Sequence, residues 1–243
     1  MIKQTLAIVI KTQKYGDTSL ICHLFTRNFG LQLFIIKGVR SHKSKSINAN
    51  LFQVGNVLDI QMYYNPTKNF QTLKECHSAF VYNTLREDIQ RNCVQTFTVE
   101  VLTQIVVSAE PQEEIFDFTY DYFLMLEQRL EMPVIYLPSF FVVQMNHLSG
   151  YRIHGAYSDA TPFFDFSKGS FTAQQPQFPP FVEGAAAMVL SKINTITTLE
   201  ELALMPNIPE RKLILQALLL FMEYHYPDFK PLKSLPVLAV ILS

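Results

Sequence analysis

Four cations stand close together in the segment 37–45, which reads KGVRSHKSK. They fall within nine residues, with serines between them and no acid among them: Lys37, Arg40, Lys43 and Lys45. Phosphate oxygens are natural partners for such a set, because each cation can neutralise one backbone charge of a nucleic acid without reading a base. The segment therefore predicts nucleic-acid binding that is sequence-independent and weakens as salt is added. The alternative interpretation is a solvated loop without a ligand.

The net charge of the whole chain, −1, conceals two parts of opposite sign. Residues 1–80 hold ten Lys or Arg against three acids, a net charge of +7, whereas residues 81–243 hold ten against eighteen, a net charge of −8. A basic part followed by an acidic part suggests that only the first part meets a polyanion. Lys11, Lys14 and Arg27 lie near expected strand ends and turns, where they could extend the same cationic surface.

Aromatic side chains could add stacking surfaces for bases. Single-strand binders of the OB type commonly use such platforms. Five aromatics of the first 80 residues are available: Tyr15, Phe34, Tyr63, Tyr64 and Phe70. Because the inward side of a small barrel must be filled, an aromatic there is more often a core residue than a platform. The sequence assigns none of the five.

The first 80 residues predict five short strands separated by turn residues. The fourth run alternates most regularly, with Leu58, Ile60 and Met62 on one side and Asp59 and Gln61 on the other, as a strand with one wet face requires. Five strands with a long polar connection between the third and the fourth are typical of a small OB-type barrel, and an SH3-like barrel would look similar. The expected strands are residues 5–12, 19–26, 30–37, 56–64 and 70–79.

After residue 80 the apolar spacing becomes helical, for example from Val94 to Ile105. Further helices are expected at 115–126, from Pro138 to about residue 150, at 183–194 and at 210–226. The predicted fold class is therefore α+β: an OB-type β-barrel domain at 1–80, then an α-helical domain at 81–243. Residues 151–182 contain four prolines and should be irregular, with a short hairpin around FFDFSKGSF.

Local signatures of catalysis are missing from the sequence. It contains no GxxxxGK[ST] phosphate loop, no HExxH, no GxSxG and no HxE with PCxxC. The pairs Cys22-His23 and Cys76-His77 are adjacent on expected strands, so each pair should point to opposite faces rather than form a catalytic couple. With Cys93 they complete three cysteines without a CxxC pair, which fits reduced thiols. We expect no catalytic residue, no metal and no cofactor.

Residues 5–45 resemble the opening of the RecO family of recombination mediators. The matching features, in order, are Lys11-Thr12 after an apolar strand, the turn Tyr15-Gly16-Asp17, Leu24-Phe25-Thr26 leading to Gly30, and Lys37-Gly38-Val39-Arg40. Two later segments agree, HLSGYR at 147–152 and PLKSLPVL at 231–238, whereas residues 81–135 match only in their helical character.

The resemblance implies a function without catalysis. Members of the family bind single- and double-stranded DNA, anneal complementary strands and help load recombinase onto strands coated with single-stranded DNA-binding protein (SSB). It also implies two protein partners for the acidic helical part, the C-terminal tail of SSB and the protein RecR. The tail would need an apolar pocket with one or two cations, for which Lys192, Arg211 and Lys212 are candidates. Without a long apolar run or a signal-peptide pattern, we expect a cytoplasmic, nucleoid-associated protein that spans no membrane.

The sequence departs from the family at one site. Many members carry a four-cysteine zinc site after the equivalent of LSGY, but residues 151–182 contain no cysteine. His154, Asp159 and Asp165 lack a paired ligand spacing, so zinc held in that way is excluded. We expect packing to hold the segment instead, through these aromatics: Tyr157, Phe163, Phe164, Phe166 and Phe171.

Two other functions remain compatible with the residues. A basic OB-type barrel could bind structured RNA rather than DNA. A non-enzymatic scaffold could use the same barrel to meet an acidic protein.

Overall fold

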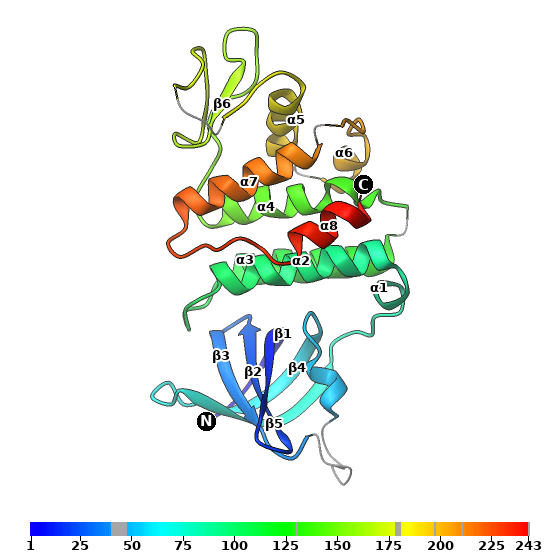
Figure 1. Cartoon of the computed structure of the whole chain (residues 1–243). Coiled ribbons are helices and arrows are strands. Elements are labelled where there is room, and N and C mark those ends of the chain that lie inside the picture. Colours follow the sequence, from blue (N-terminus) through cyan, green and yellow to red (C-terminus); the bar gives the residue numbers. More distant parts are fainter. Residues whose placement is uncertain (40–47, 130, 178–180, 197, 210, 243) are drawn as a thin grey trace. The chain divides into compact units, whose positions relative to one another are not determined.

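The computed structural model describes residues 1–39, 48–129, 131–177, 181–196, 198–209 and 211–242. They form two compact units, Met1–Arg129 and Leu130–Ser243 (Figure 1). The last barrel strand ends at Ser78 and the first helix begins at Thr84. The division into a DNA-binding domain at 1–80 and a helical domain at 81–243 stays a prediction. No helix within the described ranges is both long and apolar enough to cross a membrane.

The first unit begins with a closed barrel of five strands in the order β1-β2-β3-β5-β4. All its strand pairs are antiparallel except β3 with β5, which is parallel. This arrangement is that of a five-stranded OB barrel, so the predicted fold class is confirmed. The strands are β1 (Ile2–Tyr15), β2 (Ser19–Thr26), β3 (Gly30–Ile36), β4 (Val57–Tyr63) and β5 (Phe70–Ser78).

The barrel core follows from alternation along the strands. On β4, Leu58, Ile60 and Met62 are fully buried, as the sequence predicts, while Asp59 stays only half-buried on the outer side. The connection before β4 contributes the short 3-10 helix η1 (Ala49–Phe52), whose Phe52 is buried with the core cluster. The interior of the barrel is thus filled by side chains.

Three helices complete the first unit: α1 (Thr84–Glu87), α2 (Ile89–Ile105) and α3 (Glu113–Gln128). Asp88 caps α2 by accepting hydrogen bonds from two backbone amides of its first turn. The Glu127 carboxylate on α3 accepts three backbone N–H bonds at the start of α1, at 2.9 to 3.0 Å. The Gln95 side chain on α2 donates to the carbonyl of Gly55 at 3.2 Å, which joins α2 to the barrel.

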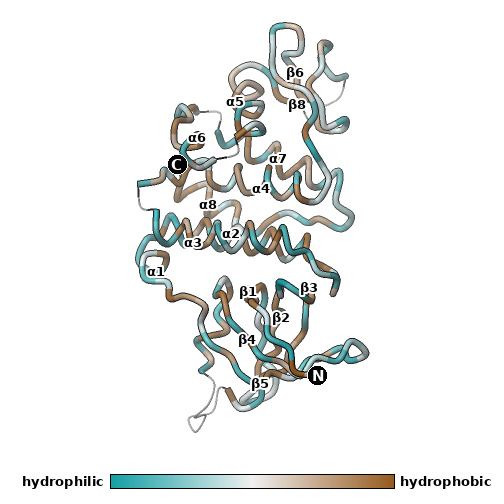
Figure 2. Tube along the Cα trace, turned by 180° about the vertical axis from the view of Figure 1, so that it is seen from behind, coloured by the Kyte–Doolittle hydropathy of each residue, from teal (hydrophilic) through white to brown (hydrophobic). Residues whose placement is uncertain are grey.

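The second unit is mainly helical, and hydrophobic and hydrophilic residues alternate along its helices (Figure 2). Its three longer helices, α4 (Leu137–Leu148), α5 (Gly184–Thr195) and α7 (Arg211–His225), confirm the predicted helices at these positions. Pro138 occupies the first turn of α4. Two shorter helices, α6 (Leu199–Ala203) and α8 (Leu235–Ile241), were not predicted. The 3-10 helix η2 (Val134–Tyr136) precedes α4.

The segment expected to be irregular contains a three-stranded sheet in the order β7-β6-β8. The predicted hairpin is confirmed as β6 (Phe163–Asp165) and β7 (Ser170–Thr172), and β8 (Phe181–Val182) adds a strand that was not predicted. Phe164, Phe166 and Phe171 are buried, and the Phe164 ring lies 4.9 Å and 5.1 Å from the other two. Aromatic packing therefore holds this small sheet.

Candidate nucleic-acid interface

The outer surface of β1, β2 and β3 gathers cations around apolar side chains. Lys11 lies opposite His23, and His23 lies opposite Leu33, so the three side chains share one face of the sheet. Their neighbours Cys22 and Phe34 are fully buried on the other face. We call this outer surface the barrel face, and it consists of Lys11, Gln13, Ile21, His23, Leu33, Ile35 and Lys37.

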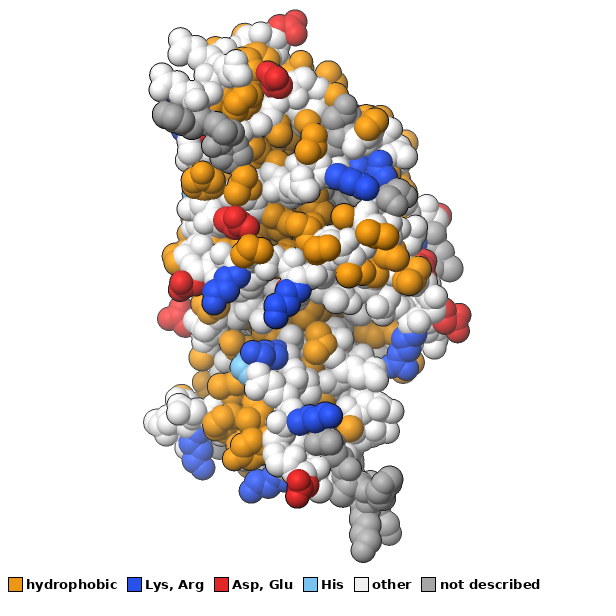
Figure 3. Space-filling view, in the orientation of Figure 1, with side chains coloured by type: hydrophobic (Ala, Val, Ile, Leu, Met, Phe, Trp, Pro, Cys, Tyr) orange, Lys and Arg blue, Asp and Glu red, His pale blue; other side chains and the backbone are white. Residues whose placement is uncertain are grey.

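β5 extends the barrel face across the parallel junction. Phe70, its first residue, lies opposite Leu33 and keeps 40% of its surface exposed. An open groove of about 430 Å³ runs along this junction and is lined by Ile35, Lys37, Phe70 and Thr72 among others. Figure 3 shows Lys, Arg and His side chains around a hydrophobic patch over the barrel strands. Apolar and cationic groups side by side suit a strand that has both bases and phosphates.

The electrostatics of the barrel face are set by two exposed lysines and one histidine. Partial burial lowers the pKa of His23 below its ordinary value, and the positive charge of Lys11 lowers it further. His23 is therefore neutral at neutral pH, where Lys11 and Lys37 carry the positive charge. A phosphate placed here would favour protonation of the imidazole.

The other predicted cations do not join this set. Lys14 lies opposite the buried Leu20, so its side chain leaves β1 on the side opposite to Lys11, although it is exposed. Arg27 holds two carboxylates of α3, donating to Asp117 at 2.7 and 2.8 Å and lying 2.8 Å from Glu113. Its charge is thus neutralised within the first unit.

Three predicted cations lie outside the described residues: Arg40, Lys43 and Lys45. Their place on a DNA-binding surface stays a prediction from the sequence.

The five aromatics divide between core and surface. Phe34 is fully buried in the barrel core. Tyr64 is partly buried and its ring packs on Phe29, with centroids 4.6 Å apart. Tyr15, Tyr63 and Phe70 are exposed to 52%, 49% and 40%. Only these last three could receive a base.

His23 and the apolar residues of the barrel face were missed as site residues. Their signal was present in the sequence, because Ile21 and His23 alternate with the buried Cys22 and Leu24. A Leu or Ile on a strand usually belongs to the core. These residues can be distinguished from core residues only once the structure shows them half-exposed beside cations.

The cysteines belong to the structure rather than to a site. Cys22 and Cys76 are buried in the barrel core, while His23 and His77 point outward, which confirms the opposite-face prediction. Burial raises the pKa of the Cys22 thiol to about 11 and that of Cys76 to about 12, so both stay protonated. Within the described ranges, no three His, Cys, Asp or Glu side chains come together as a metal site would require.

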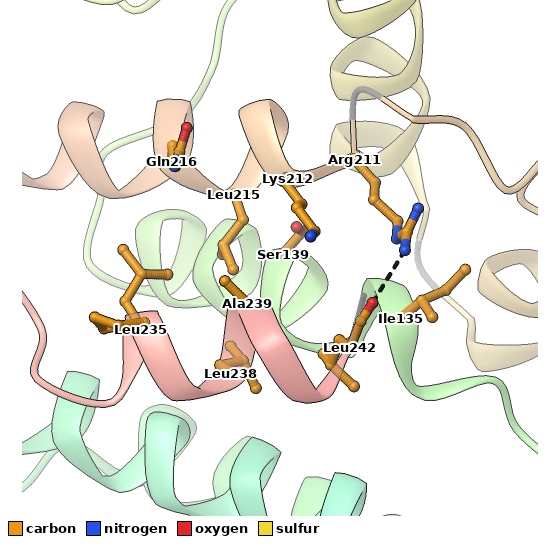
Figure 4. A pocket seen from close by; sticks show the side chains of 11 residues that line it. Ile135, Ser139, Arg211, Lys212, Leu215, Gln216, Leu235, Leu238, Ala239 and Leu242 are labelled. Atoms are coloured by element: carbon orange, nitrogen blue, oxygen red, sulfur yellow. Dashed lines mark hydrogen bonds between the residues drawn. The ribbon is translucent and has the colours of Figure 1, made fainter.

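A pocket of about 210 Å³ opens in the second unit between α4, α7 and α8. Leu215, Leu238 and Leu242 give it an apolar lining, and Arg211 and Lys212 stand at its edge (Figure 4). Arg211 donates a hydrogen bond of 3.0 Å to the Leu242 carbonyl, so it also closes the end of α8. Lys212 is exposed. The pocket thus combines an apolar surface with two cations.

Lys192, the third cation considered for a peptide tail, lies on α5 and does not line this pocket. Of the three candidates, the structure brings together Arg211 and Lys212.

Comparisons with known proteins agree over both parts of the chain. A family model described as recombination protein O, N-terminal, matches residues 1–82. The DNA repair protein RecO of Chlorobium phaeobacteroides is 38% identical over 116 residues, which are 48% of this chain and 44% of the relative. RecO of Phocaeicola vulgatus is 27% identical over 100% of both chains, and RecO of Flavobacterium johnsoniae 24% identical over 99% of both.

The barrel, the helical second unit and these matches agree with the resemblance in residues 5–45. The segment 151–182, which holds a four-cysteine zinc site in many members, has no cysteine and folds around phenylalanines. The chain is thus similar to DNA repair proteins named RecO over its whole length and to the N-terminal RecO family model over residues 1–82, and it lacks the cysteines of that zinc site.

Proposed function

We propose that this protein is a recombination mediator that binds single- and double-stranded DNA through the barrel face. In this role it anneals complementary strands and helps load recombinase onto SSB-coated single strands. The observation that carries the proposal is the apolar strip of Ile21, Leu33 and Ile35 flanked by Lys11 and Lys37. It lies on the OB surface that commonly meets oligonucleotides, the outer side of strands 2 and 3.

The lysines supply attraction without sequence readout. Lys11 and Lys37 can each neutralise one phosphate, and the sequence contains three further cations shortly after Lys37, namely Arg40, Lys43 and Lys45. Two complementary strands repel each other through their phosphates, so a surface that neutralises them favours pairing. A protein with this function acts on chromosomal DNA, and we therefore propose a cytoplasmic, nucleoid-associated location. No catalytic group or cofactor is needed for these steps.

Strand annealing, measured with and without SSB, tests this proposal. The decisive variant replaces Lys37, Arg40, Lys43 and Lys45 with alanine together, and we expect it to anneal slowly. The matched control is Arg152→Ala in the second unit, an exposed arginine that should leave annealing unchanged. Wild-type annealing by the quadruple variant would reject the proposed surface.

The pocket of the second unit supports a place for the SSB tail. An acidic peptide that ends in a hydrophobic residue needs an apolar cavity with cations at its edge, and Arg211 and Lys212 stand beside such a cavity. We expect Lys212→Glu to weaken binding of an SSB tail peptide, measured by fluorescence anisotropy, while Lys192→Glu, at an exposed lysine of α5 outside this pocket, does not. Equal binding by both variants would argue against this pocket. RecR is proposed as a partner on the family resemblance alone, without a surface.

Competition binding separates this function from its alternatives. Preference for folded RNA over single-stranded DNA at equal salt would favour the RNA-binding alternative. Absence of binding to any nucleic acid at moderate salt would favour a scaffold that meets an acidic protein.

A further inference from the structure

Phe70 follows the turn between β4 and β5, and hydrogen bonds from a buried side chain fix the backbone of this turn. The buried Gln71 side chain donates to the carbonyls of Asn65 at 3.0 Å and Lys68 at 3.1 Å, and accepts from the Asn65 amide at 2.9 Å. The Asn65 carboxamide in turn accepts from the amide of Thr67 at 3.0 Å. The turn between β4 and β5 is therefore fastened from inside, and Phe70 begins β5 in a fixed position.

A second exposed aromatic lies on the same side of the sheet. Tyr63 lies opposite Thr72, and Thr72 shares its face with Phe70 because the two are two residues apart on β5. Phe70 and Tyr63 are thus diagonal cross-strand neighbours, a separation of about 7–8 Å at which aromatic side chains still meet the same ligand. Among the described residues, neither ring packs against another aromatic ring.

Charge and apolar surface flank this pair. Lys37 lines the groove together with Phe70, and the exposed Lys68 stands two residues before it. On the other side Phe70 meets Leu33 of the barrel face. An exposed, rigid aromatic between lysines is a suitable surface for an unpaired base, whose flat face stacks while its phosphates meet the cations.

We propose that Phe70 is a stacking platform for an unpaired base, with Tyr63 as its neighbour, and that this platform makes the barrel prefer single strands to duplex. The inference rests on the proposed function, because it assumes that DNA lies on the barrel face. In a duplex the bases are stacked on each other, so their flat faces do not reach Phe70. Duplex DNA would then be held by the lysines alone.

The test compares Phe70→Leu with the wild-type chain. Leucine keeps an apolar side chain but removes the aromatic face, so affinity for a single-stranded oligonucleotide should fall about tenfold. Affinity for the matched duplex and the salt dependence of binding should not change, because no charge is lost. Phe70→Tyr should restore wild-type affinity, and Tyr224→Leu, at an exposed tyrosine of α7, should behave like the wild type.

A strand of abasic nucleotides provides an independent readout. Wild-type protein should bind it about as weakly as Phe70→Leu binds the normal strand, and the substitution should have no further effect on the abasic strand. Equal losses for single strand and duplex, or unchanged affinity for the normal strand, would overturn the platform.

Failure of the platform is distinguishable from failure of the proposed function. If Lys11→Gln and Lys37→Gln weaken binding but Phe70→Leu does not, DNA lies on the barrel face and only the stacking role is wrong. If none of the three substitutions weakens binding, the barrel face is not the DNA site. Circular dichroism of each variant checks that the barrel is folded.

Discussion

The salt dependence of DNA binding gives a direct count of phosphates held by the barrel face. Lys11 and Lys37 are exposed there, and neither side chain is engaged by a carboxylate among the described residues. If each neutralises one phosphate of a single strand, each contributes about 0.7 to the slope of log affinity against log salt. Lys11→Gln combined with Lys37→Gln should therefore reduce that slope by about 1.4.

This slope translates into an affinity ratio that depends on salt. The advantage of the wild-type chain over the double variant should shrink about sevenfold when salt is raised fourfold, from about 50 to about 200 mM. Fluorescence anisotropy of a labelled single-stranded oligonucleotide over that range measures both values. Glutamine keeps length and polarity, so the folded barrel should persist.

Arg27→Gln and Arg152→Gln make the comparison specific. Arg27 is already neutralised by Asp117 and Glu113, so its loss should change the slope by much less than that of Lys37. Arg152 lies in the second unit and should leave the slope unchanged. A double variant with the wild-type slope, or an Arg27 variant with the larger loss, would refute the assignment of phosphates to these lysines.

Four further outcomes follow from single side chains. Burial alone would raise the pKa of Asp165, but hydrogen bonds from Ser167 and Lys168 lower it overall. The ionised Asp165 therefore stabilises the fold above its ordinary pKa, and this stabilisation is lost as pH falls through the lowered value. Asp165→Asn should cost about 1–3 kcal/mol in urea unfolding at neutral pH and less in acid. Glu127→Gln, which weakens the cap of α1, should cost about 0.5–2 kcal/mol by the same measurement. His23→Gln should abolish the rise in single-strand affinity expected as pH falls through the lowered pKa of His23, since protonation adds a cation to the barrel face. Gly30→Ala should lower the free energy of unfolding by about 1–3 kcal/mol, because φ is +61° and a Cβ there would overlap backbone of the α2–α3 connection.

The alternation of apolar and polar residues predicted the barrel strands, because alternate residues of each strand face the core. The alternation of Leu58, Ile60 and Met62 specifies one buried face, and the other strands are bounded by turn residues in the same way. The closure of the barrel could not be predicted from one strand at a time, since β3 meets β5 across more than thirty residues of sequence. The prediction of a closed OB-type barrel rested on the number of strands and on the long polar connection between the third and the fourth, and the resemblance in residues 5–45 agreed with it.

The three short elements α6, α8 and β8 were not predicted from the sequence. α6 has five residues, too few for a helical repeat, although the capping box of Thr198 and Glu201 marks its start. α8 carries Pro236 in its first turn, where proline begins a helix as readily as it ends one. β8 has two residues and exists through its pairing with β6.

The candidate site could be predicted in its charge but not in its arrangement. The excess of cations in residues 1–80 made Lys11, Lys14 and Arg27 candidates for one surface, but in the structure their side chains do not share one. Side chains three residues apart on a strand point to opposite faces, so the sequence alone could have separated Lys14 from Lys11. The carboxylate partners of Arg27 are about ninety positions away, on α3, and only the folded chain brings them together.

The parallel junction of β3 and β5 is the weakest seam of the barrel. Two residue pairs, Leu33 with Phe70 and Phe34 with Gln71, close it, against seven between β2 and β3. Backbone amides along this seam should be the first in the barrel to exchange with deuterium, because local opening needs few hydrogen bonds to break. A ligand that touches Lys37 and Phe70 at once would bridge the seam, and so slow that exchange as it binds. Local opening of the barrel and ligand binding to its outer face would therefore both act on the β3–β5 junction.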